Sequence, residues 1–259
     1  MYRSINAAII MAGLVAVAPP VHAAESKPTV VLVHGAFADA SSWGGVITQL
    51  EKDGYRVVAI ANPLRGVRTD AEYVGRVVAN VEGPVVMVGH SYGGFVINEA
   101  ASTDGKVKAL VFVAAFAPEE GETAAQLSGR FPGSTLAGTL GDAIALEDGR
   151  KDLYIRQEAF HDQFAADVDA DEAEVMAVTQ RPITDAALGE PSTRAAWKTI
   201  PSWFVYGDAD RNIPAAALSF MAERARSRQS VVVKGASHVV MVSNPAVVTK
   251  VIEEAAAAE

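Results

Sequence analysis

Short runs of β-branched and other apolar residues alternate along the chain with longer amphipathic stretches. The short runs predict strands, and the stretches with helical spacing of apolar positions predict helices. The predicted strands cover residues 29–33, 56–61, 85–88, 107–114, 203–206 and 231–233, and the predicted helices cover residues 46–52, 71–81, 95–101, 215–225 and 245–258. Strands that are apolar on both faces belong to a parallel sheet covered by helices. The alternation is therefore typical of a doubly wound α/β fold with a mostly parallel central sheet.

This alternation breaks at residues 116–199, where glycine, proline, acidic residues and short helical patterns replace the strand signals. We expect this segment to be a mainly helical insertion that caps the sheet rather than a second domain. Its acidic cluster starts at Asp167 and ends at Glu174. A calcium-binding loop starting at Asp167 needs glycine at its sixth position and glutamate at its twelfth, whereas the chain has Glu172 and Val178 there. The cluster is therefore interpreted as a solvated helix face.

Residues 1–23 have the layout of a secretory signal peptide. Arg3 is followed by an uncharged apolar run over residues 5–18, and small residues precede an expected cleavage site after Ala23. The apolar run is roughly 14 residues long, whereas a helix that spans a bilayer needs about 20. We therefore expect an exported protein, periplasmic or secreted, whose α/β domain covers residues 24–259. No later apolar run is long enough to span a membrane, so no membrane association is expected after signal removal.

Charge and composition narrow the expected partners. The formal net charge is −9 and the basic residues are scattered, a pattern that argues against binding to nucleic acid or to an anionic membrane. A neutral or cationic small molecule fits this charge better. The chain has no cysteine, which excludes a cysteine nucleophile, a thiolate metal site and disulfides.

The strand predicted at residues 85–88 runs directly into the pentapeptide Gly-His-Ser-Tyr-Gly at residues 89–93, and a helical pattern follows at once. A strand that turns sharply into a helix holds the residue at the apex in a strained backbone conformation. Glycine is needed on both sides of the turn because neighbouring segments pass too close for side chains. This context predicts that Ser91 is a nucleophile.

A serine hydroxyl is a poor nucleophile near neutral pH, so it needs a base that takes its proton. Of the five histidines, His22 lies in the expected signal peptide. His90 adjoins the nucleophile, and we expect its side chain to point away and to pack. His34 is interpreted as a structural loop residue and His161 as an exposed one. His238 follows the last predicted strand and precedes the last helix, so it is the predicted base.

The base in turn needs an acidic side chain that orients it. Two aspartates follow the strand predicted at residues 203–206. Asp208 comes directly after a glycine and is equally suited to capping the loop, whereas Asp210 lies further out, where the chain can bend toward His238. Asp210 is the predicted acid. The order Ser91, Asp210, His238 is the nucleophile-acid-base order of α/β-hydrolases.

Acyl transfer passes through a tetrahedral oxyanion that needs N–H donors waiting for it. The amide of Tyr92 lies at the start of the helix that follows the nucleophile, where the helix dipole adds to its effect. The second donor is expected from the loop at residues 34–37, with Ala36 as the predicted residue and Phe37 left as the alternative. This chemistry requires no cofactor, and no metal site is predicted.

These motifs resemble the α/β-hydrolase superfamily, and more closely the group that contains plant methyl-ester esterases, hydroxynitrile lyases and small bacterial esterases. The matching stretches are residues 31–36 with Trp43 downstream, 88–94, 114–118, 206–210 and 235–238. The resemblance implies an α/β-hydrolase fold. It also implies that Ser91, Asp210 and His238 are catalytic and that the amide of Ala36 is an oxyanion donor.

Two departures from the group's pattern bear on the reaction. Hydroxynitrile lyases of this group place a cyanide-binding lysine directly after the catalytic histidine and a threonine after the first-strand histidine, whereas this chain has Val239 and Gly35. An apolar Val239 cannot stabilise departing cyanide. We therefore expect a serine esterase that cleaves a small, hydrophobic carboxylic ester through an acyl-enzyme. A lyase of the cyanohydrin type and a cofactor-free perhydrolase remain alternatives on the same triad.

The expected preference for a hydrophobic ester depends on aromatic residues of the insertion. They suggest an apolar pocket, although each of them fits the insertion's own core at least as well: Phe131, Tyr154, Phe160 and Phe164.

Overall fold

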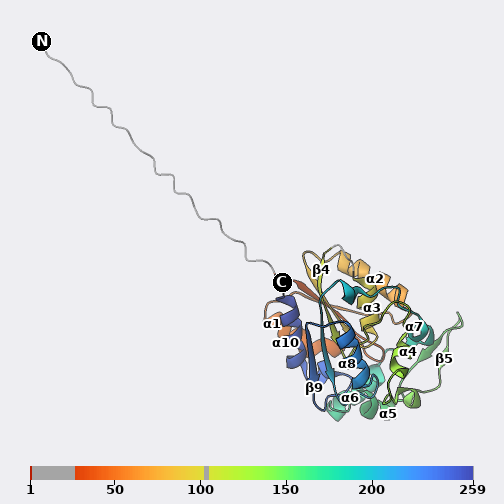
Figure 1. Ribbon diagram of the computed structural model, residues 1–259. Helices are drawn as coiled ribbons and strands as arrows, with labels where there is room; N and C mark the ends of the chain where they lie inside the picture. Colours follow the sequence, from red (N-terminus) through yellow and green to blue (C-terminus); the bar gives the residue numbers. More distant parts are fainter. Residues whose placement is uncertain (2–26, 102–104, 259) are drawn as a thin grey trace.

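The computed structural model describes residues 1, 27–101 and 105–258 of the chain. Apart from Met1, the expected signal peptide lies outside these described residues. The described chain forms a six-stranded sheet with helices on both faces and a cap inserted at one end (Figure 1). Among the described helices, none combines the length and the apolar character needed to span a bilayer.

All strands of the central sheet run parallel, in the order β2-β1-β3-β4-β8-β9. Their bounds are β1 (Thr29–Val33), β2 (Val57–Ile60), β3 (Val85–His90), β4 (Val107–Val113), β8 (Ser202–Gly207) and β9 (Gln229–Val233). The inner strands are buried on both faces, as predicted, and consist largely of branched side chains that pack well on a pleated surface. The edge strand β9 differs, because its residues alternate between half-buried and exposed.

Two pairs of helices cover the opposite faces of this sheet. Helix α1 packs against α10 on one face, and α2 packs against α3 on the other (Figure 1). The helices outside the cap are α1 (Gly44–Lys52), α2 (Val67–Ala79), α3 (Gly93–Ala100), α8 (Ala215–Arg224), α9 (Val240–Ser243) and α10 (Pro245–Ala256), with a 3₁₀ turn η1 (Ala40–Trp43) before α1. Helix α2 begins four residues before its predicted start, because Asp70 lies in its first turn and its carboxylate accepts the N–H groups of Arg65 and Gly66.

The cap is the segment between β4 and β8. It contains α4 (Ala124–Gly129), η2 (Leu136–Thr139), β5 (Ile144–Ala145), β6 (Lys151–Leu153), α5 (Gln157–Phe164), α6 (Ala170–Thr179), β7 (Ile183–Thr184), α7 (Asp185–Gly189) and η3 (Ala196–Lys198). Helices predominate, as expected. The sequence did not predict the small antiparallel sheet β5-β6-β7, because strands of two or three residues are too short to show an alternating pattern.

The parallel sheet fixes the place of the candidate site. Parallel strands all end at the same edge of the sheet, and ligands of such folds bind outside the carboxyl ends of the strands. The loops after β1, β3, β8 and β9 therefore meet at this edge. These four loops carry all the residues that the sequence singled out for chemistry.

Candidate active site

Ser91 lies at the apex of the turn between β3 and α3, with a positive φ of 53°. A residue other than glycine adopts this conformation only under strain. The turn is tight enough that a Cβ atom at Gly89 would lie 2.6 Å from the carbonyl oxygen of Gly93, and one at Gly93 would lie 2.4 Å from that of Val33. The two glycines are thus required by close backbone approach, and the turn presents the Ser91 side chain at the strand ends.

The three residues of the predicted triad lie in one hydrogen-bonded chain. Ser91 Oγ lies 2.9 Å from Nε2 of His238, and Nδ1 of His238 lies 2.7 Å from Oδ2 of Asp210. The other carboxylate oxygen of Asp210 accepts the backbone N–H groups of Asn212 and Ile213 at 2.8 and 2.9 Å. Because Nδ1–H of His238 donates to the carboxylate, the neutral ring presents the lone pair of Nε2 to the serine hydroxyl. This arrangement can take a proton from Ser91.

Asp208, the competing candidate for the acid, has a different contact. It is exposed, and its carboxylate accepts the backbone N–H of Gly235 at 2.6 Å. The contact ties the loop after β8 to the loop after β9, three residues before His238. Asp208 therefore holds the loop, while Asp210 contacts the imidazole.

His90 packs against His238 itself, a contact that the sequence did not indicate. The two ring centroids lie 4.8 Å apart, and Nε2–H of His90 donates to the carbonyl oxygen of His238 at 3.1 Å. Two effects hold the pKa of His90 well below its ordinary value. The larger is the complete burial of the ring, and the second is the neighbouring His238 ring. His90 therefore stays neutral and supports the backbone of the candidate base.

His34 fixes the end of β1. Its Nδ1–H donates to the carbonyl oxygen of Gly35 at 2.8 Å, and Nε2 accepts the N–H of Asn62 at 3.0 Å. Burial lowers the pKa of His34 to about 4, so the ring is neutral near pH 7. His161 is half-buried rather than exposed, and its Nε2 lies 3.0 Å from the carbonyl oxygen of Val168.

Acid is expected to destabilise the fold through His34. The unfolded ring takes up a proton below its ordinary pKa of 6.5, whereas the folded ring does so only near pH 4. The free energy of unfolding should therefore fall as the pH falls between these values, by about 2 to 3 kcal/mol at pH 4.5 for this one group. Urea unfolding at pH 7 and pH 4.5 measures the difference.

The matched variant is His34→Gln, which cannot titrate. It should be less stable than the original chain at pH 7, because the ring's hydrogen bonds are lost, but its stability should depend less on pH. An unchanged dependence on pH would show that His34 does not carry the effect.

The two predicted oxyanion donors come from different loops, Ala36 from the loop after β1 and Tyr92 from the turn between β3 and α3. Among the described residues, no protein acceptor takes the N–H of Ala36 or of Tyr92. The N–H of Phe37, the alternative donor, already donates to the carbonyl oxygen of Arg181 in the cap at 3.0 Å. The hydrogen-bond pattern therefore favours Ala36 over Phe37.

Gly35 lies directly against the candidate nucleophile. A Cβ atom at this position would lie 2.6 Å from Cβ of Ser91 and 2.8 Å from the carbonyl oxygen of His90. Neither atom belongs to the far end of a flexible side chain, so neither can easily move aside. The loop after β1 can approach Ser91 this closely only because residue 35 has no side chain.

Gly35→Ala is accordingly expected to lower kcat for a small ester by about 10- to 100-fold, because a displacement of about 1 Å in a catalytic arrangement costs about 10²-fold. Steady-state kinetics and thermal melting measure the effect. The control is Gly44→Ala at the start of α1, where a Cβ would meet nothing within 4 Å. Equal activity of the two variants would contradict the close contact.

Aromatic residues of the cap cover this site. The ring of Phe164 lies 5.2 Å from that of His238 and 6.2 Å from that of Phe37, and Phe160 packs against Phe164 at 5.0 Å. Phe160 and Phe164 are fully buried, so they are at once the cap's core and its contact with the site. The other two aromatics that the sequence singled out contribute less. Phe131 instead packs against Phe220 of α8 at 5.6 Å, and Tyr154 is half-buried in the cap.

The acidic cluster of the cap includes one residue that contacts the site loop. Asp167 accepts the N–H of Ser237, the residue before His238, at 3.0 Å. The interpretation as a solvated helix face is therefore wrong for Asp167, because helix α6 begins only at Ala170 and Asp167 lies in the preceding loop. Asp169 caps α6 by accepting the N–H of Asp171. No sequence pattern distinguishes Asp167 from its acidic neighbours.

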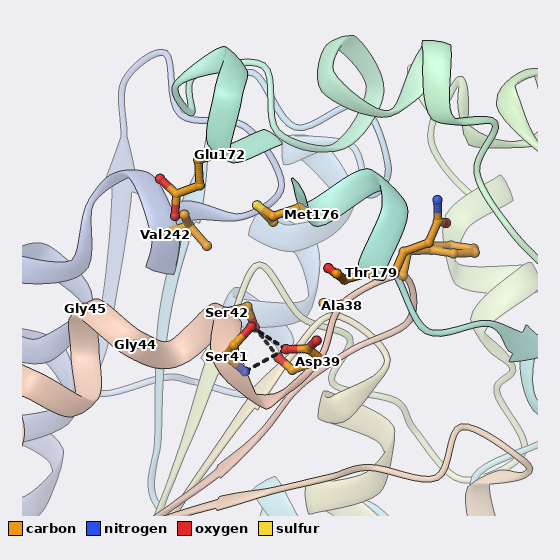
Figure 2. Close-up of a pocket in the computed structure, with 12 residues that line it drawn as sticks. Ala38, Asp39, Ser41, Ser42, Gly44, Gly45, Glu172, Met176, Thr179 and Val242 are labelled. Carbon is orange, nitrogen blue, oxygen red and sulfur yellow. Dashed lines mark hydrogen bonds between the residues drawn. The ribbon is translucent and has the colours of Figure 1, made fainter. Parts of the chain in front are cut away.

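A groove of about 210 Å³ borders the loop that carries Ala36. Figure 2 shows Ala38 and Asp39 on one side of it and Met176 and Thr179 of α6 on the other. Ser91 is not among its lining residues and is only 7% exposed. The groove therefore runs along the loop after β1, whereas the triad itself lies beneath the cap.

A family model described as the alpha/beta hydrolase family matches residues 30–251 of the chain. Together with the fold, this match establishes that the chain belongs to the α/β-hydrolase family. Its resemblance to the group of plant methyl-ester esterases, hydroxynitrile lyases and bacterial esterases is likewise confirmed by similar proteins of these kinds.

Three of these similar proteins illustrate the range of the family. The chain is 27% identical to the alpha/beta hydrolase nvfD of Aspergillus novofumigatus, over 89% of this chain and 97% of that protein. It is 24% identical to an alpha-hydroxynitrile lyase of Arabidopsis thaliana, over 85% of this chain and 94% of that protein. The crystal structure of polyneuridine aldehyde esterase matches with a TM-score of 0.76 and 18% identity, over 88% of this chain and 98% of that one. That structural match confirms the fold class.

Proposed function

We propose that this protein is a serine esterase that hydrolyses a small carboxylic ester with a hydrophobic acyl or alcohol part through an acyl-enzyme. The observation that carries the proposal is the continuous chain from Ser91 Oγ to His238 at 2.9 Å and from His238 to Asp210 at 2.7 Å. Esterases among the similar proteins, including a putative methylesterase, support the same reaction class.

In the proposed first half-reaction, Ser91 Oγ attacks the ester carbonyl carbon while its proton passes to Nε2 of His238. The carbonyl electron pair moves onto oxygen, and the N–H groups of Ala36 and Tyr92 hold that oxyanion. When the intermediate collapses, the C–O bond to the alcohol breaks, and Nε2 returns its proton to the leaving oxygen. Asp210 keeps the ring in the required tautomer and stabilises the imidazolium.

In the second half-reaction, water replaces the alcohol. Nε2 of His238 takes a proton from the water as it attacks the acyl carbon, and the same amides hold the second oxyanion. Collapse releases the carboxylic acid and returns the proton to Ser91. Every proton transfer uses groups of this chain, so the reaction calls for no cofactor.

The proposed preference for a hydrophobic ester follows from the aromatic residues that cover the site. The buried rings of Phe164 and Phe37 pack beside His238 and in the loop after β1, and they make the surroundings of the site apolar. Burying an apolar substituent in such surroundings contributes about 25 cal/mol per Å². A short alkyl or aryl group beside the scissile ester is therefore favoured over a charged one.

Cyanohydrin cleavage is disfavoured by two positions. Val239 follows His238 directly and is fully buried, so it offers no charge to a leaving cyanide. Gly35 stands where the lyases of this group have threonine, and a side chain there would overlap Ser91. The proposal is therefore esterase chemistry rather than C–C lysis.

Active-site labelling and a substrate panel test this proposal. A fluorophosphonate probe should label Ser91, and p-nitrophenyl esters from acetate to decanoate should be hydrolysed with a preference for the shorter chains. Mandelonitrile tests the lyase reaction, and acetate with hydrogen peroxide tests the perhydrolase reaction. A folded sample that shows neither labelling nor ester turnover would contradict the proposal, as would a faster reaction with either alternative substrate.

We also propose that the protein is exported and that the cleaved form begins at Ala24. Fractionation of the producing cells followed by N-terminal sequencing tests this. A protein that keeps Met1 and stays in the cytoplasm would overturn the proposal without affecting the esterase assignment.

A further inference from the structure

The loop between β2 and α2, residues 61–66, contacts the segment that carries one candidate oxyanion donor. The backbone N–H of Asn62 donates to Nε2 of His34 at 3.0 Å, and its side-chain amide donates to the carbonyl oxygen of His34 at 2.9 Å. Both partners are fully buried. Because His34 lies two residues before Ala36, the loop at residues 61–66 holds the chain just before the Ala36 amide.

The same loop is tied to the residue that carries the other donor. The hydroxyl of Tyr92 donates to Oδ2 of Asp70 at 3.0 Å, and this carboxylate also accepts the N–H groups of Arg65 and Gly66. Asp70 is fully buried and Tyr92 is 1% exposed. A buried carboxylate is costly unless it is hydrogen-bonded, so this cluster holds the Tyr92 ring and the loop in one arrangement.

The third partner of the loop is the cap. The guanidinium of Arg65 donates to Oδ1 of Asp152 in β6 at 2.6 Å and to the carbonyl oxygen of Pro182 at 2.8 Å. Thr184 of β7 also binds the loop. Its hydroxyl donates to the carbonyl oxygen of Arg65 at 3.0 Å, and its backbone N–H donates to the carbonyl oxygen of Leu64 at 3.2 Å. The small antiparallel sheet of the cap is thus fastened to the loop by side-chain and backbone contacts.

The loop is also strained where these contacts meet. Leu64 has a positive φ of 62°, a conformation that a branched residue keeps only when its surroundings impose it. Its side chain is fully buried, and its carbonyl oxygen accepts the bond from Thr184. Releasing the cap therefore removes one of the contacts that hold this conformation.

We propose that Arg65 is a positioning residue that makes the oxyanion site depend on the seating of the cap. Through Arg65, the β6-β7 part of the cap docks on the loop at residues 61–66, and the loop in turn sets the segments that carry Ala36 and Tyr92. This inference rests on the proposed esterase function. It adds that the position of the cap controls the rate of the esterase reaction. Because oxyanion donors act mainly in the transition state, undocking lowers kcat rather than raising KM.

The test is Arg65→Met, which keeps most of the side-chain length and removes the guanidinium. With p-nitrophenyl acetate, kcat should fall by about 10- to 100-fold, while KM changes by less than about threefold. This fall is smaller than the loss of about 10²- to 10³-fold that removal of an oxyanion donor causes, because the donors are displaced but still present. A trifluoromethyl ketone, whose adduct with serine carries an oxyanion, should lose affinity in parallel with kcat/KM.

The matched control is Arg68→Met in the first turn of α2. Arg68 is exposed and pairs on the surface with Glu72, so its loss should leave kcat within about twofold, as for most exposed ion pairs. Asp152→Asn is the milder second variant. It weakens the same contact from the cap side and should give a smaller fall in kcat, which tests the inference if Arg65→Met does not fold.

A readout without catalysis separates this inference from the esterase proposal. Amide hydrogen exchange at residues 34–37 and 91–93 should be faster in Arg65→Met than in the unmodified chain and unchanged in Arg68→Met. Unchanged exchange and kcat in a folded Arg65→Met variant, or a rise in KM alone, would overturn the positioning role. An unmodified chain without ester turnover would overturn the esterase proposal, while the exchange rates would still decide the coupling.

Discussion

Ser91→Ala is expected to lower kcat for a p-nitrophenyl ester by about 10⁵- to 10⁶-fold, the loss that removal of a triad serine causes. In the proposed mechanism, the hydroxyl is the only group of the triad that forms a bond to the acyl carbon. The oxyanion donors and the binding surface stay in place, so KM should change little. Steady-state kinetics measures the loss, with a variant sample that contains no contaminating unmodified protein. The fluorophosphonate probe should no longer label the variant.

Ser91→Gly gives the matched comparison for stability. It should be as inactive as Ser91→Ala but more stable by about 1 kcal/mol, because glycine adopts a positive φ without the strain of a side chain. The observed φ at this residue is 53°. If either variant kept more than a hundredth of the activity, a different nucleophile would be responsible.

Asp210→Asn is expected to lower kcat by about 10⁴-fold, because the amide can hold the imidazole in the wrong tautomer and cannot stabilise the imidazolium. Asp210 Oδ2 is the acceptor for Nδ1–H of His238 at 2.7 Å. An amide that turns its NH₂ group toward Nδ1 instead places the proton on Nε2, where the lone pair is needed. The pH dependence of kcat measured alongside shows whether the base has lost its function.

Asp208→Asn is the control for this prediction. An asparagine at position 208 still offers an oxygen to the N–H of Gly235, the contact that Asp208 makes at 2.6 Å. Its kcat should therefore stay within about threefold of the original, in the range of an exposed contact. Losses of equal size in the two variants would show that the acid was assigned to the wrong aspartate.

The sequence predicted the central sheet and the grouping of Ser91, Asp210 and His238 because both follow from rules that act over short distances along the chain. Each of these three residues lies in the turn or loop that follows a predicted strand, and parallel strands end at one edge. The bends that bring Asp210 and His238 together involve only the loops after β8 and β9. The loop carrying Ala36 follows β1 in the same way, so its position was also predictable.

The supporting contacts were not predictable, because their partners are far apart in the sequence. Arg65 reaches Asp152 across 87 residues, and Asp167 reaches Ser237 across 70. Nothing in the local pattern around a surface-type arginine or aspartate indicates such a partner. His90 is a different case, since its place beside Ser91 was evident but the direction of its ring depends on the packing of His238 and Phe164.

The contact between Gly35 and Ser91 also constrains how this chain could acquire another reaction during evolution or in the laboratory. Introducing the threonine and lysine of the lyases at positions 35 and 239 changes only two side chains, yet a Cβ at position 35 would lie 2.8 Å from the backbone carbonyl oxygen of His90. The backbone after β1 would have to shift before the new threonine fits. Substitutions that reposition that loop must therefore come first, so more than these two substitutions separate this chain from the lyase pattern.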